Sequence, residues 1–273
     1  MHQQLARIWN KALIHSLARQ LAFGSLVEDC EFGIDITTGH LNFSNGLEYK
    51  IQVIGTESEE SNSWLWAWAN ESIDNPDILS VARKLQALGE EKQVPELTTP
   101  QLPLDEENNG LVFITVAQHI AKAPTYYSCD TGAGRAFFLV YPCSDTSRYA
   151  RPKPHMLNEA FAQVMPSVPF NHQLALVTAA KASGIAVTSE DRLSIAGVDY
   201  EFDQYGSVTS FTQHQAPSEA PTGPVGQTVP AAETEPKKPA LAGASPTSEL
   251  DIPEPPKPEP ARSTSRRHRR RRR

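Results

Sequence analysis

Apolar residues change their spacing several times along the first 214 positions, and each change predicts a new element. Residues 3–23 repeat apolar side chains at intervals of three and four, which is typical of an amphipathic helix. From Phe32 the interval becomes two, and the alternation continues through residues 41–43 and 47–53. Asn45-Gly46 is a strong turn signal because both residues tolerate positive φ. With the next run, at 64–68, this half predicts a four-stranded antiparallel meander.

The second half mixes the two spacings. Asn75-Pro76 has the pattern of a helix N-cap followed by the first helical position, and the helix is expected to end near Gly89. Further helices are predicted at 110–123, 155–165 and 171–183, and a hairpin at 126–130 and 136–141. Alternating runs close this part at 185–187, 193–195, 198–202 and 208–211. The sequence therefore predicts an α+β fold, with antiparallel meander sheets covered by several helices.

Composition divides the chain near residue 214. We expect one globular α+β domain over 1–214, with two sub-lobes, 1–104 and 105–214, as an alternative division. Residues 215–261 hold 12 of the 22 prolines and no aromatic residue, which predicts a disordered Pro-rich linker. Residues 262–273 form an Arg-rich basic tail.

Charge and cysteine usage limit the class of protein. Residues 1–214 carry 14 basic and 25 acidic residues, a net charge of −11, whereas the remainder carries +4. Cys30, Cys129 and Cys143 are odd in number and form no CxxC pair, so neither a disulfide framework nor a zinc site is indicated. No run of 18 apolar residues and no signal peptide is present. We therefore expect a cytoplasmic protein without a transmembrane segment.

The arginine run is the strongest chemical signal in the sequence. Seven of the last eight residues are arginine: Arg266, Arg267, Arg269, Arg270, Arg271, Arg272 and Arg273. Such a run predicts non-specific binding to nucleic acid or another polyanion, with an affinity that falls as salt rises. The alternatives are a contact with the acidic body of the same chain and a merely solubilising role.

Three of the four tryptophans, Trp64, Trp66 and Trp68, are spaced at i, i+2 and i+4. On one strand their rings would face the same way. They would either fill the core or form a platform for a ligand or partner, with Asn70 as an adjacent polar contact. The platform requires exposed rings.

A longer pattern surrounds these tryptophans. Residues 55–60 read Gly-Thr-Glu-Ser-Glu-Glu and residues 64–70 read Trp-Leu-Trp-Ala-Trp-Ala-Asn, which resembles the hallmark of a bacterial family of uncharacterised domains. The similarity continues through 85–91, 94–98 and 102–105, and we expect it to cover most of residues 1–213. The resemblance implies membership of the family alone, since it brings no catalytic residues with it.

Candidate catalytic patterns are short. Asp130-Thr131-Gly132 matches the motif of aspartic proteases, but the chain has no second Asp-Thr/Ser-Gly. Cys129 is a possible nucleophile, with His119 or His155 as its base, although a cysteine in a strand is more often a buried apolar residue. His155 and Glu159 lie one helical turn apart and could share a metal, but no third ligand can be named. We expect no catalytic residues, no metal and no cofactor.

The leading hypothesis is a non-enzymatic module that binds another macromolecule, with the tail attached to a polyanion. One alternative is a hydrolase whose site is assembled from scattered residues such as Glu57, His119 and Asp130. Another is an immunity or inhibitor protein, in which the acidic body binds a basic protein partner.

Overall fold

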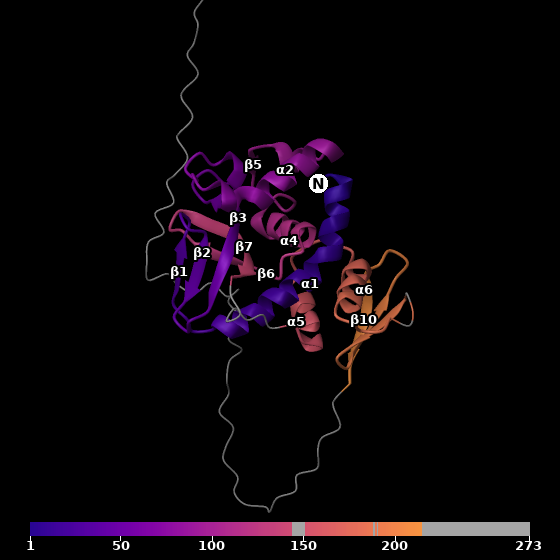
Figure 1. Cartoon of the computed structure of the whole chain (residues 1–273). Coiled ribbons are helices and arrows are strands. Elements are labelled where there is room, and N and C mark those ends of the chain that lie inside the picture. The colour runs from indigo at the N-terminus through magenta and orange to yellow at the C-terminus, as the bar shows by residue number, and fades with distance from the viewer. Residues whose placement is uncertain (144–150, 188, 190, 215–273) are drawn as a thin grey trace, which may run out of the picture.

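Figure 1 shows the computed structural model of the chain, which describes residues 1–143, 151–187, 189 and 191–214. The predicted linker, 215–261, and the predicted basic tail, 262–273, lie outside the described residues. No helix in the described part of the chain is long and apolar enough to cross a membrane.

The centre of the fold is a seven-stranded sheet in which every pair of neighbouring strands is antiparallel. Its strands are β1 (Phe32–Asp35), β2 (His40–Phe43), β3 (Glu48–Ser58), β4 (Ser63–Trp66), β5 (Gln101–Pro103), β6 (Thr125–Asp130) and β7 (Gly134–Pro142). The first four form the predicted meander, which is therefore confirmed. The long strand β3 pairs with β2 and β4 along one edge and with β7 along the other. β5 extends the sheet from β4, and β6 extends it from β7.

The pairing of β3 with β7 joins the two halves of the chain. Nine residue pairs, from Tyr49 opposite Pro142 to Ser58 opposite Gly134, align the two strands. One sheet therefore contains strands from both of the alternative sub-lobes, 1–104 and 105–214. The register shifts between Val53 and Gly55, so β3 contains a bulge that leaves Ile54 without a partner.

The helices follow the predicted order with small differences at their ends. They are α1 (Gln3–Val27), α2 (Ser80–Lys92), α3 (Pro95–Thr98), α4 (Gly110–Ala121), α5 (Pro154–Val164) and α6 (His172–Ala182), with 3-10 turns η1 (Ala67–Ala69) and η2 (Pro76–Leu79). The sequence predicted that the second helix ends near Gly89, but α2 continues to Lys92 and is capped by Gln93, which adopts a left-handed conformation with φ 55°. Gly89 is buried inside the helix, where a Cβ would lie 2.6 Å from the Cβ of Leu97.

Both faces of the seven-stranded sheet are covered. On one face, α4 packs over Ile54, Phe137 and Leu139, and α1 crosses behind α4. On the other, side chains that include Phe23 of α1 and Leu79 of η2 cover the alternate strand residues. The sheet is therefore apolar on both sides, with helices and turns as the outer layer.

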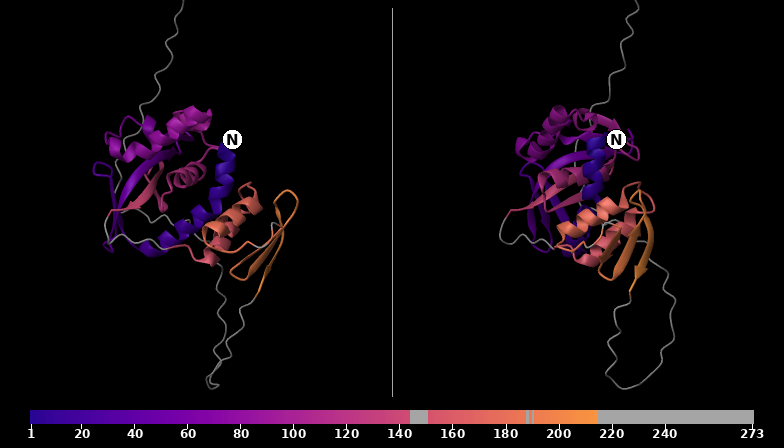
Figure 2. Two further views of the ribbon diagram at one scale, coloured as in Figure 1. Left: turned by 45° about the vertical axis from the view of Figure 1, so that its right-hand side comes forward. Right: turned by 90° about the vertical axis from the view of Figure 1, so that its right-hand side faces the viewer.

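A C-terminal unit completes the described structure. It consists of α5, α6 and a second antiparallel sheet in the order β10 (Val208–Gln213), β9 (Val198–Phe202) and β8 (Arg192–Ile195). The alternating runs predicted these three strands, whereas 185–187 forms none. Figure 2 shows the unit on the outer side of α1, away from the larger sheet. Because α1 packs on α4 as well as on α5 and α6, it is enclosed between the two parts of the fold.

Candidate functional site

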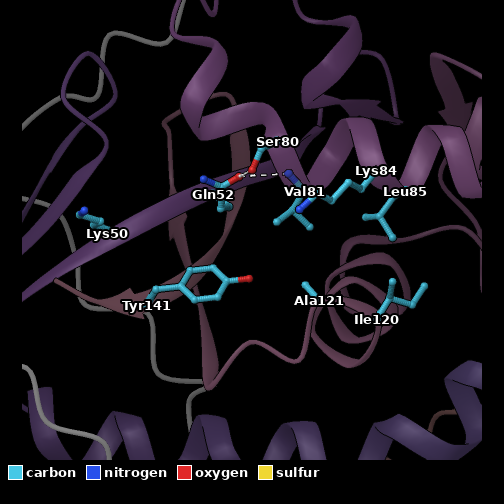
Figure 3. Close-up of a pocket in the computed structure, with 9 residues that line it drawn as sticks. All are labelled: Lys50, Gln52, Ser80, Val81, Lys84, Leu85, Ile120, Ala121 and Tyr141. Carbon is cyan, nitrogen blue, oxygen red and sulfur yellow. Dashed lines mark hydrogen bonds between the residues drawn. The ribbon is translucent and has the colours of Figure 1, made fainter.

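A groove of about 490 Å³ opens on the face of the larger sheet where α4 ends (Figure 3). The helix stops because Lys122 takes a left-handed conformation, with φ 52°, and Pro124 follows. Lys50 and Gln52 of β3 and Tyr141 of β7 form the floor of the groove.

Gln52 fixes the opposite wall of the groove. Its Oε1 accepts hydrogen bonds from the Ser80 hydroxyl, at 2.8 Å, and from the Val81 N–H, at 3.1 Å (Figure 3). Its Nε2 donates to the carbonyl of Asp77 at 2.7 Å. The strand thus holds the beginning of α2, and this places Lys84, one turn further along the helix, at the rim of the groove.

The groove is lined by cationic and hydroxyl donors. Lys50 and Lys84 are exposed, and neither forms an ion pair with a carboxylate of the described residues. Lys50 lies directly opposite Tyr141 across the β3–β7 pair. Burial raises the pKa of Tyr141, so its hydroxyl remains protonated and able to donate. The remaining lining is apolar: Val81, Leu85, Ile120 and Ala121.

The lining contains no aspartate, glutamate, histidine or cysteine, so its polar side chains are lysines, hydroxyls and one amide. The hydroxyl of Ser80 donates to Gln52. The groove can accept an anionic group beside the lysines together with an apolar group against α2 and α4.

The structure does not expose the predicted tryptophan platform. Trp64 and Trp66 are each 0 % exposed and pack with Phe113 and Phe137 in the core. The Trp66 Nε1 donates to the carbonyl of Glu96 at 2.9 Å. In this conformation neither ring can stack on a ligand, and their alternation reflects core filling.

Trp68 does not share the strand of the other two tryptophans. The strand ends at Trp66, and Trp68 lies in η1, half-buried between the two parts of the core. Asn70 is buried, and its Oδ1 accepts a hydrogen bond from the Ser72 N–H at 3.0 Å. This contact assigns Asn70 to the local turn, where short polar side chains commonly bond the backbone two residues further on.

The residues of the hydrolase alternative are only partly brought together. Glu57 and Asp130 lie on either side of Arg135 in the strand order β3, β7, β6. Glu57 accepts a hydrogen bond from the Gly110 N–H, at the start of α4, whereas His119 lies in the last turn of that helix. Asp130 is the last residue of β6, and its Oδ1 accepts from the Gly132 N–H at 2.7 Å. His119, at the other end of α4 from Glu57, therefore does not share a site with the two carboxylates.

The remaining chemical candidates have structural explanations. Burial raises the pKa of Cys129 to about 12, so its thiol is protonated at neutral pH and is a poor nucleophile. His155 and Glu159 are exposed on α5, with 4.0 Å between Nε2 and Oε1. Within the described residues, no group of three or more potential ligands could hold a metal ion. The tail arginines lie outside the described residues.

The groove residues were missed by sequence reasoning. Lys50 and Gln52 alternate with buried neighbours, as solvent-facing strand residues ordinarily do, and Lys84 has the spacing of an exposed helix position. Their proximity depends on the β3–β7 pairing and on the point where α4 ends. Gln52, a polar residue in the middle of the long strand β3, was the local feature of the sequence that could have indicated the groove.

Comparison with known proteins assigns residues 6–142 of the chain to a family. No curated protein and no solved structure matches the chain. A family model matches residues 6–142, from α1 to the end of β7, and thus includes the groove. The match is shorter than the expected 1–213, because the C-terminal unit lies beyond it. The chain belongs to the DUF6882 family, a family of unknown function.

Proposed function

We propose that the chain is a non-enzymatic module that binds a polyanionic macromolecule. The groove takes anionic groups of the partner at Lys50 and at Lys84, with the Tyr141 hydroxyl as a further donor. The Arg-rich tail attaches non-specifically to the same partner. The observation that carries this proposal is the gathering of donors around a groove whose lining has no carboxylate, on a body of net charge −11.

The contact at the groove is weak by itself and is supported by the contact of the tail. Exposed ion pairs are each worth about 0.2–1 kcal/mol, so two lysines alone bind weakly. The apolar residues of the groove add binding free energy when they bury an apolar group of the partner that lies next to its anionic group. Because tail and groove belong to one chain, binding by the tail raises the concentration of the partner at the groove.

Removal of residues 215–273 is expected to abolish most binding to single-stranded DNA at low salt. If all seven terminal arginines contact phosphates, log K falls against log salt with a slope of about −5. The measurement is the fluorescence anisotropy of a labelled oligonucleotide with the full chain and with residues 1–214. Equal affinity of the two proteins at low salt would contradict attachment by the tail.

Charge reversal in the groove is expected to weaken the salt-resistant part of binding. In the full chain, Lys84→Glu and Lys50→Glu should each raise the Kd for the oligonucleotide about tenfold at a salt concentration that suppresses the tail. The reason is that each places a carboxylate where the proposal places an anionic group. The matched control is Arg83→Glu, which makes the same charge change at the neighbouring exposed position of α2, outside the groove lining.

Three outcomes separate the tail from the groove. Weakening by both groove variants, with Arg83→Glu unchanged, supports the proposal. An equal effect of all three substitutions would mean that the binding depends on the net charge of the protein and not on the groove, which would contradict the proposal. If none of them changes the Kd, the groove does not contact this polyanion.

A further inference from the structure

A second pocket, of about 360 Å³, lies between α1 and α4. It is lined by Ala12, His15, Ser16, Arg19, Gln118, His119 and Lys122. At 3.6 residues per turn, its α4 residues face away from Ile120 and Ala121, which line the groove. A water molecule occupies about 30 Å³ in the liquid, so the pocket has room for a ligand of several heavy atoms.

The α1 wall of this pocket contains Arg19, and further basic residues lie along the same side of the helix. Arg7, Lys11, His15 and Arg19 follow one another at intervals of four along the helix, which aligns them in one row. All 25 residues of α1 lack an acidic side chain, although the body as a whole is strongly acidic. The pocket lining likewise contains no carboxylate.

Several polar groups of the lining are already engaged with the protein. Ser16 donates to the Gln118 Oε1, and the Gln118 Nε2 donates to the carbonyls of Ala123 and Pro124. One Nη of Arg19 donates to the carbonyl of Ala123 at 3.0 Å. A guanidinium has five N–H donors, so this bond anchors Arg19 and leaves others for a ligand.

The two histidines are electrostatically disfavoured as cations in the empty pocket. Burial, followed by the charge of Arg19 and the proximity of His119, lowers the pKa of His15 to about 4. Burial, followed by Lys11 and Arg19, lowers the pKa of His119. Both imidazoles are therefore mainly neutral at pH 7, and an anion between them would favour their protonation.

We propose that this pocket binds a dianionic oxyanion of the phosphate class between Arg19, Lys122 and the two histidines, with uptake of protons by the imidazoles. This site is separate from the groove and does not depend on the proposed function. The cations come from both sides of the pocket, since α1 provides Arg19 and the C-cap of α4 is Lys122. Phosphate and sulfate offer oxygens in several directions and can accept from donors on both walls.

The end of α4 opposes an anion here, because the last carbonyls of a helix carry partial negative charge. Two of these carbonyls are hydrogen-bonded within the protein. The carbonyl of Gln118 accepts from the Ala123 N–H at 3.0 Å, and that of His119 accepts from the Lys122 N–H at 3.3 Å. The positive charges of Arg19 and Lys122 act against the remaining dipole.

The test follows the histidine ring resonances of the full chain by NMR during titration with sodium sulfate. Sulfate stays doubly charged over the range used, so any proton uptake belongs to the protein. Saturable shifts of the His15 and His119 signals are expected, and binding should tighten about tenfold between pH 8 and pH 5. A tenfold gain corresponds to a rise in the pKa of His15 from about 4 to about 6 on binding.

Two variants and a matched control locate the site. His119→Gln and Lys122→Gly should each raise the Kd for sulfate about tenfold. Glycine suits the left-handed backbone at Lys122, so that variant should keep the fold intact. The control, Gln93→Gly, makes the same change at the left-handed end of α2, without a change of charge, and should leave the Kd unchanged.

Further titrations separate the sources of the ligand. Saturation by inorganic phosphate alone indicates a site for the free ion, whereas tighter binding of a nucleoside monophosphate indicates a phosphate ester. Because only the ring signals of His15 and His119 are followed, binding of these anions to the arginine tail does not contribute to the measured Kd. The proposal is overturned if no saturable shift occurs, if binding does not depend on pH, or if His119→Gln and Lys122→Gly bind sulfate as tightly as Gln93→Gly.

Discussion

Replacement of Trp64 by alanine is expected to lower the free energy of unfolding by about 3–5 kcal/mol. The side chain is 0 % exposed, and its ring centre lies 5.1–5.5 Å from those of Trp66, Phe113 and Phe137. The backbone is shaped to this ring, since a Cβ on Gly55 would lie 2.3 Å from it. The neighbours cannot collapse fully into the space that the indole leaves.

Denaturant unfolding of the Trp64→Ala chain, followed by circular dichroism, measures this loss. The control is Tyr205→Ala, which removes an aromatic ring that is 76 % exposed and should change the free energy of unfolding by less than about 0.5 kcal/mol. A platform tryptophan would behave in the opposite way, because its loss would weaken binding and leave stability nearly unchanged. A loss below about 1 kcal/mol at Trp64 would therefore contradict its assignment to the core.

Truncation after Cys143 is expected to prevent folding to a soluble monomer. The shortened chain keeps the family-matched residues 6–142 but lacks the C-terminal unit that covers one side of α1. The truncation removes eight large buried side chains: Leu157, Phe161, Val164, Leu176, Leu193, Ile195, Tyr200 and Phe202. These side chains belong to the core that packs against α1, so their removal exposes apolar surface on that side of the helix.

Size-exclusion chromatography and binding of a hydrophobic dye test the truncation. Residues 1–143 should elute as aggregates or bind the dye, whereas residues 1–214, which keep every described element, should be monomeric and show one cooperative unfolding transition. A monomeric 1–143 chain with cooperative unfolding and no dye binding would mean that the larger sheet, α1 and α4 are stable without the C-terminal unit.

The elements of this fold are largely local in origin, and the sequence predicted them well. Residues 3–23 show the spacing of a helix because one side of α1 packs on α4 and another on α5 and α6. The turn at Asn45-Gly46 connects β2 to β3 as expected, with φ 83° at the glycine. Such features depend on neighbours within a few residues, so they can be predicted from the local sequence.

Long-range pairing left no such pattern. The alternation of residues in β3 does not indicate which strand pairs with its second edge, and in the structure that strand is β7. The bulge at Ile54 depends on this pairing. Likewise, the spacing of Trp64 and Trp66 fits a buried face and an exposed one equally well. Both candidate binding sites lie beside the end of α4, where segments far apart in the chain meet, so neither could be located from sequence alone.

The position of α1 between the two parts of the fold also orders events during synthesis. This helix is translated before its partners, and α5 and α6, which cover one side of it, are complete only at Ala182. At about 5–20 residues per second, the ribosome needs roughly 8–30 s to reach that point from Val27. Throughout that interval the apolar surface of α1 that α6 will cover has no native partner, so this helix depends on other contacts to keep it from aggregating.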